Sequence, residues 1–390
     1  RFSMSHLVTP FNDLKMELWE RSKSAFWSEW FWLPTNVTWS DFENKVDGPY
    51  YPQVSDMYFP FPLALLIYVI RQIVERFFFM PLGLYLGLKN EKPRQAPPNP
   101  VLELAYKKHK NPNAKIIEGL VKQVDKDVRQ VERWFRIRRN QDRASTMKKF
   151  TESGWRFVFY FSAFVYGIVI LWNKPWLWTS RLCWEGFPHE HSLSNTVYWY
   201  YLIEISFYWS LMFSQFMDVK RKDFTEMFVH HAATISLLFF SWCANVVRIG
   251  AVILVIHDCC DFWLEAAKMA KYVQFHKICE SLFAIFGALW LFTRLIFFPY
   301  KAIFSSMFES TQIVGFYPAL VFFNGWLLTL LILHGFWFSL IVKVTYKAFT
   351  STGEIEGDVR SSTEEEVTPE TDEDPLATAN HVDHLRHKSG

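Results

Sequence analysis

The residues best suited to chemistry are two histidines and two aspartates on neighbouring apolar stretches. His230 and His231 lie on the first stretch, and Asp258 and Asp261 lie on the second. Ionisable side chains are costly inside a membrane and are usually functional. Imidazole acts as a general base or as a nucleophile, and a carboxylate can orient an imidazole and stabilise its charged form. We therefore expect these four residues to be catalytic.

Helical geometry gathers further polar residues around these four. At 100° per residue, the polar residues of the stretch 249–268 fall within an arc of about 100°, and those of 225–246 span a similar arc. Lipid would reject either polar face alone, so we expect the two faces to meet. The substrate-cavity candidates on these faces are Thr234, His257, Glu265 and Lys268.

The preceding apolar stretch adds a stripe of polar residues. Glu204 and Tyr208 share one helical face with Gln215 and Asp218. In one interpretation this face lines the same cavity, so Glu204 and Tyr208 are further substrate-cavity candidates. Hydrogen bonding between helices explains these two residues equally well.

The composition is typical of a polytopic membrane protein with soluble inserts. Of 390 residues, 51% are hydrophobic and 19% are aromatic, and apolar segments alternate with charged ones. The five cysteines form no CxxC pair, which excludes a disulfide scaffold and a zinc cluster. We expect an all-α fold, a membrane helix bundle of about seven spans with a small cytosolic helical insert. The expected spans are 61–84, 152–172, 196–217, 225–246, 249–268, 279–298 and 319–342.

Charge and hydropathy divide the chain into segments. Inside the first span, Arg71 and Glu75 are expected to form an ion pair at i, i+4 rather than a catalytic group. The first 60 residues lack an apolar core long enough for a signal peptide. The expected domains are an N-terminal segment, 1–60; a first transmembrane helix, 61–84; a cytosolic linker and insert, 89–150; a six-helix catalytic membrane domain, 151–348; and a disordered acidic tail, 349–390.

Basic residues accumulate on one side of the membrane. The insert and Lys220-Arg221-Lys222 lie on the richer side, whereas few cations lie on the other. By the positive-inside rule, the insert and the C-terminus are cytosolic and the N-terminus is lumenal. The sequon Asn36-Val37-Thr38 then faces the lumen, so we predict glycosylation at Asn36.

The tail carries a candidate modification site. Ser361, Ser362 and Thr363 precede Glu364-Glu365-Glu366. We predict phosphorylation of the three hydroxyls by an acid-directed kinase, and a merely solubilising tail is the alternative.

The insert contains a segment similar to the recognition helix of a homeodomain. It includes Trp134-Phe135 and Arg138-Arg139-Asn140, but Ile137 stands where that family places the asparagine that contacts adenine. Sequence-specific DNA binding is therefore disfavoured. A helical module that packs on the membrane domain or handles substrate is favoured, and a basic surface for anionic lipid or for the phosphates of a CoA ester is the alternative.

Several motifs together resemble a known family, the ceramide synthases, whose Lag1 motif lies in a TLC-type membrane domain. The homeodomain-like insert resembles the animal members, and the resemblance covers roughly 27–350. The motifs are Trp32-Leu33-Pro34, Asn36-Val37-Thr38, Arg221-Lys222-Asp223-Phe224, His230-His231, Arg248-Ile249-Gly250, His257-Asp258 and Asp261.

This resemblance implies an enzyme of the endoplasmic reticulum membrane. It would transfer a fatty acyl group from acyl-CoA, as co-substrate, to the amine of a sphingoid base, giving (dihydro)ceramide with no bound cofactor. A metal site of His and Asp is stereochemically feasible, but aminolysis of a thioester requires none, so we predict no metal. The resemblance suggests His230 as the acyl-accepting nucleophile and leaves general-base catalysis open. It also allows a homodimer or a heterodimer with family members.

The connection 299–318, expected to be a lumenal loop, is a candidate determinant of acyl chain length. A C16 chain that starts near the cytosolic histidines extends about 20 Å, which crosses most of a hydrocarbon core of about 30 Å. The loop resembles that of members preferring palmitoyl-CoA, so we predict C14–C16 over C22–C24, against the alternative of a passive connector. The residues in question are Phe308, Glu309, Ile313, Val314 and Phe316.

Two other functions compete with the enzyme. Intramembrane charges also mark transporters and channels, but the internal repeats and broken helices typical of transporters are not apparent. A membrane-tethered DNA-binding regulator is weakened by Ile137.

Overall fold

A computed structural model describes residues 9–46, 48–90, 94–218 and 222–350. This part of the chain is all-helical and contains no strand, which confirms the expected all-α class. The predicted phosphorylation sites Ser361, Ser362 and Thr363 lie outside the described residues.

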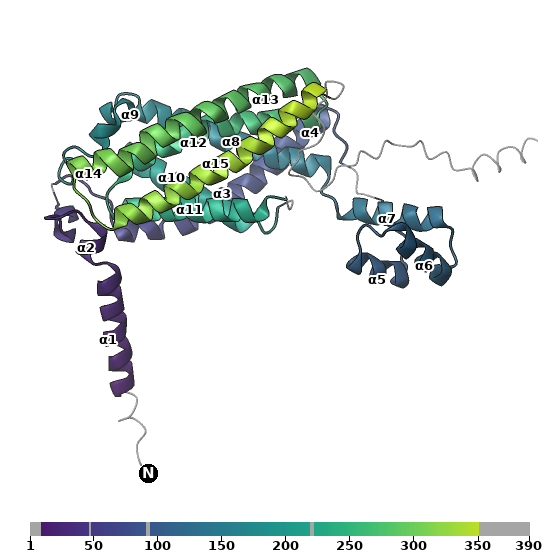
Figure 1. Cartoon of the computed structure of the whole chain (residues 1–390), viewed down its shortest axis with the longest axis horizontal. Coiled ribbons are helices and arrows are strands. Elements are labelled where there is room, and N and C mark those ends of the chain that lie inside the picture. Colours follow the sequence, from purple (N-terminus) through teal and green to yellow (C-terminus); the bar gives the residue numbers. More distant parts are fainter. Residues whose placement is uncertain (1–8, 47, 91–93, 219–221, 351–390) are drawn as a thin grey trace, which may run out of the picture.

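A bundle of long helices forms the body of the molecule (Figure 1). Short helices cover one end, and the insert projects beyond the other. The bundle consists of α3 (Pro60–Val74) continued by η4 (Glu75–Phe79) and α4 (Met80–Tyr85), α8 (Thr146–Leu171), α10 (Asn195–Ser214), α11 (Phe224–Cys243), α12 (Val247–Tyr272), α13 (His276–Trp290) continued by η6 (Leu291–Phe297), η7 (Pro299–Glu309) and α14 (Ser310–Ile313), and α15 (Ala319–Thr350).

Four helices in the described residues are long and apolar enough to cross a membrane. They are Val54–Tyr85, Val128–Leu171, His276–Ile313 and Ala319–Lys347. The helices α10, α11 and α12 are also long but are not in this set. They carry many of the buried polar residues, such as Glu204, His231 and Asp258, which neighbouring helices rather than lipid surround.

The expected loop 299–318 is wrong for most of its length. Residues 299–313 continue the helix that begins at His276, and only the segment after Ile313 is non-helical. A proline normally interrupts a helix because it lacks the amide donor. Pro299 instead begins the π-helical segment η7, whose wider turns use a different bonding pattern. The helix ends before Gly315, where the backbone has φ +90°.

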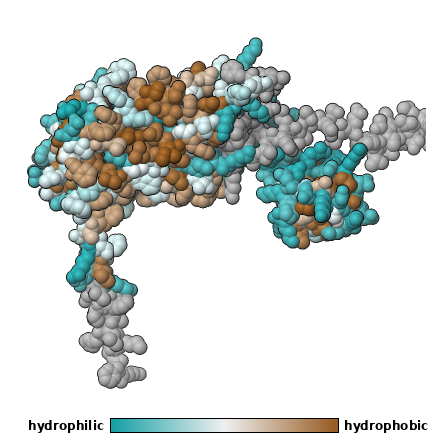
Figure 2. Space-filling view, viewed as in Figure 1, coloured by the Kyte–Doolittle hydropathy of each residue, from teal (hydrophilic) through white to brown (hydrophobic). Residues whose placement is uncertain are grey.

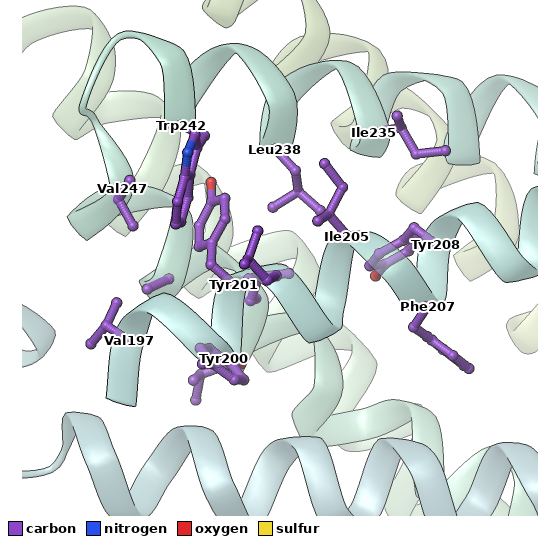
Figure 3. Close-up of a cluster of buried hydrophobic side chains, with 14 of the residues drawn as sticks. Val197, Tyr200, Tyr201, Ile205, Phe207, Tyr208, Ile235, Leu238, Trp242 and Val247 are labelled. Carbon is purple, nitrogen blue, oxygen red and sulfur yellow. The ribbon is translucent and has the colours of Figure 1, made fainter. Parts of the chain in front are cut away.

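The centre of the bundle is packed around α10. Tyr200, Tyr201 and Phe207 are almost completely buried, and Figure 3 shows Tyr201 close to Trp242. A Cβ on Gly250 would lie 2.3 Å from the Tyr201 hydroxyl, so only glycine lets α12 approach α10 this closely.

A network of buried ion pairs joins the helix ends nearest the insert. The expected pair between Arg71 and Glu75 is confirmed, at 2.5 Å. Arg71 also contacts Asp218 at 2.8 Å, and Arg156 contacts the same carboxylate at 3.0 Å. Asp218 of the predicted polar stripe therefore belongs to this network.

The N-terminal segment lies at the opposite end of the bundle, and its first helix projects away from the bundle (Figure 1). It comprises α1 (Thr9–Phe26), α2 (Glu29–Trp32), η2 (Trp39–Phe42) and η3 (Val54–Tyr58). Trp32 stacks on Phe240 with 4.7 Å between ring centroids, and Trp242 donates to the Gln53 carbonyl at 2.9 Å. Two short helices of the bundle's own loop, α9 (Pro175–Trp178) and η5 (Ser180–Cys183), lie at this end too (Figure 1).

The insert folds around its own small core. It consists of α5 (Pro100–Lys108), α6 (Ala114–Val124) and α7 (Val128–Asp142), with Asn99 and Asn113 capping the first two helices. Val131, Trp134 and Phe135 are buried against the other two helices. Figure 2 shows a mostly hydrophilic exterior.

A polar contact closes this small core on one side. Tyr106 donates to Asp142 at 3.0 Å. Burial and this hydrogen bond raise the pKa of Tyr106 to about 12, so its hydroxyl stays protonated at neutral pH.

We predict that Phe135→Ala unfolds the insert and leaves the bundle intact. Replacing a fully buried phenylalanine with alanine lowers the free energy of unfolding by about 3–5 kcal/mol. A module with so small a core has little more stability than that to lose. Limited trypsin digestion of the membrane-embedded protein measures the effect as faster cleavage between 94 and 149. Leu104→Ala, at a position 60% exposed on the same module, is the control and should digest like wild type. Equal trypsin resistance of the Phe135 variant would contradict an independently folded insert.

Candidate functional site

The two adjacent histidines lie at the end of the second turn of α11 and face different neighbours. His231 is buried, and its Nδ1 lies 3.0 Å from the Gln215 Oε1, while the Gln215 amide nitrogen donates to the Phe224 carbonyl. Because that amide fixes Oε1 as an acceptor, the Nδ1 of His231 is the donor. His230 is half-buried, and its Nδ1 has no hydrogen-bond partner among the described residues.

The ring of His257 is held on the other side of the cavity. Its Nδ1 lies 2.7 Å from the Ile253 carbonyl on the same helix. A carbonyl can only accept, so Nδ1 carries the hydrogen and the neutral ring has its lone pair on Nε2. That Nε2 is buried without a partner in the described part of the chain.

A buried arginine organises this region. Arg294, on η6, is 2% exposed and donates to the His257 carbonyl and to the Asp261 carboxylate, both at 2.8 Å. Its third acceptor is the Nε2 of His334 on α15, at 3.3 Å. The guanidinium therefore connects α12, η6 and α15 through separate hydrogen bonds.

The two predicted carboxylates have other partners than the expected imidazoles. Asp261 is held by Arg294, and Asp258, which is fully buried, accepts from the Tyr200 hydroxyl at 3.4 Å. Both carboxyl oxygens of Glu204 and the Oδ1 of Asp258 are buried without a hydrogen-bond partner among the described residues. Neither aspartate is hydrogen-bonded to a described histidine side chain, so an orienting role through direct bonds is not seen in this structure.

The polar face expected on α12 is divided into two groups. His257 lies beside His334 of α15, while Asp261 bonds Arg294 and Asp258 bonds Tyr200. Glu265 and Lys268 instead form a buried ion pair at 2.6 Å, and Arg156 lies within electrostatic range of Glu265. These two residues therefore belong to the charged end of the bundle rather than to the histidine cavity. Their short ion pair lowers the free-energy cost of burying both charges.

An apolar slot runs from His257 toward Trp184 at the opposite end of the bundle. Tyr208, Thr234 and His257 line its polar end. The Thr234 hydroxyl donates to the His230 carbonyl at 2.9 Å. Along α11, the lining residues run from Thr234 to Ser241, which corresponds to about 10 Å. The remaining lining is Trp184, Tyr201, Leu237, Leu238, Ser241, Val246, Ile249, Gly250, Ile253, Leu254, Ser306, Phe323, Leu327 and Leu330.

The candidate chain-length residues lie mostly outside this slot. Phe308 and Phe316 are exposed, at 50% and 64%. Ile313 and Val314 pack against the cluster around Trp32, and Glu309 is half-buried on η7. From this segment the buried Ser306 reaches the slot.

Sequence reasoning missed Arg294 and His334. Each is an ionisable residue inside an apolar stretch, and this was the signal that could have found them. Their contacts depend on how three helices are placed side by side, which the periodicity of one helix does not determine.

The arrangement combines the His230 imidazole, whose Nδ1 has no partner in the described residues, with neighbouring imidazoles held by hydrogen bonds and an apolar slot. Such a site can transfer an acyl group whose chain is buried in the slot. In the described residues, no three His, Cys, Asp or Glu side chains are grouped as metal ligands are.

The chain is similar to proteins of known identity over most of its length. Residues 149–343 match the family model described as the TLC domain. Ceramide synthase 5 from Homo sapiens is 47% identical over 344 residues, which cover 87% of this chain and 88% of that protein. Human ceramide synthase 4 is 41% identical, with 87% and 86% covered, and human ceramide synthase 3 is 42% identical, with 83% and 84% covered.

We predict strong energetic coupling between Asp261 and Arg294. Asp261→Asn or Arg294→Gln alone leaves one buried charge without its partner, at a cost of about 3–5 kcal/mol. The double variant loses both charges and should be more stable than the sum of the single effects allows. Thermal unfolding in detergent measures all four proteins. Additive losses would contradict a direct ion pair.

Proposed function

The chain belongs to the ceramide synthase family, and we propose that it acylates a sphingoid base with the fatty acyl group of acyl-CoA at the His230 end of the slot. The product is ceramide or dihydroceramide, and free CoA is released. The observation that carries this proposal is an apolar slot with His257 at its polar end, beside His334 and His230. A transporter or a DNA-binding regulator does not account for that combination.

We favour a covalent route through His230. An imidazole nitrogen attacks the thioester carbonyl, the carbon–sulfur bond breaks, and CoA leaves as a thiolate that takes up a proton. The amine of the base then attacks the acyl-imidazole, the carbon–nitrogen bond to His230 breaks, and the amine loses a proton as the amide forms. His230 suits the nucleophile because its Nδ1 has no partner in the described chain, whereas His231 is held by Gln215. General-base catalysis by the same ring is the alternative.

The remaining polar residues position this chemistry. Arg294 fixes Asp261 and the backbone of His257. Tyr208 lies within electrostatic range of both aspartates. We infer that Asp258 and Asp261 set the field around the histidines without bonding them directly.

The proposed setting is the membrane of the endoplasmic reticulum. The charged end of the bundle and the insert face the cytosol, where acyl-CoA is available, and seven helices span the bilayer. Asn36 is exposed at the opposite end, which supports a lumenal N-terminus open to glycosylation.

We predict that wild-type protein mixed with palmitoyl-CoA, without base, gains the mass of one palmitoyl group on His230. His230→Ala should lose both this adduct and more than about 99% of product formation. Intact-protein mass spectrometry and peptide mapping detect the adduct, and sphinganine should remove it. Normal turnover of wild type with no adduct would exclude the covalent route and favour general-base catalysis. His189→Ala, at an exposed loop position, is the control.

We also propose that the slot limits the acyl chain to about C14–C16. Ser306 is buried at the slot wall, so Ser306→Leu should shorten the space and move the preference by about two to four carbons toward shorter acyl-CoA. Phe308→Ala, at an exposed position of the same segment, should leave the profile unchanged. Ceramide profiles from a mixture of acyl-CoA lengths measure both variants. An unchanged profile for an active Ser306 variant would remove the slot as the determinant.

A further inference from the structure

Two buried ring nitrogens beside the site lack partners and are complementary. His257 is 5% exposed and presents an unpaired Nε2, as derived from its bond to the Ile253 carbonyl. His334 is completely buried, and its Nε2 faces the Arg294 guanidinium. Because a guanidinium only donates, that Nε2 must accept, and the hydrogen of the neutral ring is on Nδ1. This Nδ1 also has no partner among the described residues.

The two rings are neighbours, with 5.0 Å between their centroids. One offers an acceptor and the other offers a donor. A buried donor and a buried acceptor that lack partners cost free energy. A ligand group that hydrogen-bonds to both therefore contributes more binding free energy than one that bonds to solvent-exposed groups. A hydroxyl fits both needs, because it accepts from one nitrogen and donates to the other.

The pair also lies next to the reacting centre. The ring centroid of His334 is 6.4 Å from that of His230. A sphingoid base carries its amine on the carbon between two hydroxyl-bearing carbons. A hydroxyl bound near His334 therefore places the amine within reach of an acyl group at His230.

We propose that His257 and His334 form the binding site for a hydroxyl of the acceptor base, and that this contact positions the amine. The proposal rests on the proposed function, since it names how the same site recognises its second substrate. It makes the two histidines substrate-binding residues that select amines with an adjacent hydroxyl. It also gives Arg294 a role, because its bond to Nε2 keeps the Nδ1 of His334 as a donor.

The experiment compares three acceptors with the full-length enzyme and saturating palmitoyl-CoA. They are sphinganine, its analogue without the C1 hydroxyl and its analogue without the C3 hydroxyl. For wild type, one of the two analogues should have a kcat/KM about tenfold lower than sphinganine, as expected for loss of a buried hydrogen bond. Equal kcat/KM for all three bases would overturn the proposal.

Two matched variants separate binding from support of Arg294. His334→Gln places an amide near the original Nε2, so it can still accept from Arg294 but lacks the Nδ1 donor. His334→Asn places an amide near the original Nδ1, so it can still donate to the substrate. We expect His334→Gln to reduce the tenfold discrimination to about twofold or less, and His334→Asn to retain it.

The opposite pattern would show that His334 acts only by supporting Arg294, and would overturn the proposal. Equal discrimination in both variants and wild type would do the same. Thr329→Ala is the control on α15, because its hydroxyl is exposed and bonds to the Gly325 carbonyl of its own helix. Absence of product from wild type with every base would instead refute the proposed function, so the two failures are distinguishable.

Discussion

The site depends on one buried cation. Arg294 lies inside an apolar bundle, where a charge is tolerated only when hydrogen bonds replace its hydration. Its three acceptors come from α12 and α15, and its own helix is π-helical at that point. Local π-helical turns often occur at functional sites, because they shift a side chain that a regular helix would direct elsewhere. The hydrogen bonds that stabilise the buried guanidinium therefore also fix the positions of His257, Asp261 and His334.

The rest of the bundle separates the polar residues of the site from the apolar slot. The charged network around Arg71 closes the end next to the insert, and the aromatic cluster around Trp32 closes the other. Between them, the slot is lined mostly by apolar side chains, with His257 near one end. An acyl chain placed there exchanges water for apolar contacts along its length, which supplies binding energy remote from the reacting carbon.

The sequence predicted the helical class, the ion pair Arg71–Glu75 and the location of the main histidine motifs. These properties are local, since they follow from periodicity and from spacing within one helix. The connection 299–318 was predicted incorrectly because π-helical turns around Pro299 have no simple sequence signal. Arg294 and His334 were missed because their pairing depends on the relative register of three helices.

The histidines differ in freedom, and this difference follows from their partners. Gln215 fixes the ring of His231, the Ile253 carbonyl fixes that of His257, and Arg294 fixes that of His334. The Nδ1 of His230, by contrast, has no hydrogen-bond partner within the described residues. A nucleophile must approach a carbonyl carbon and then carry the acyl group, so a rigidly bonded ring nitrogen would oppose both steps. Binding residues have the opposite requirement, because a fixed tautomer and orientation preserve the geometry that substrate recognition needs. The same cavity therefore holds one imidazole free to react and neighbours held in place to position what it reacts with.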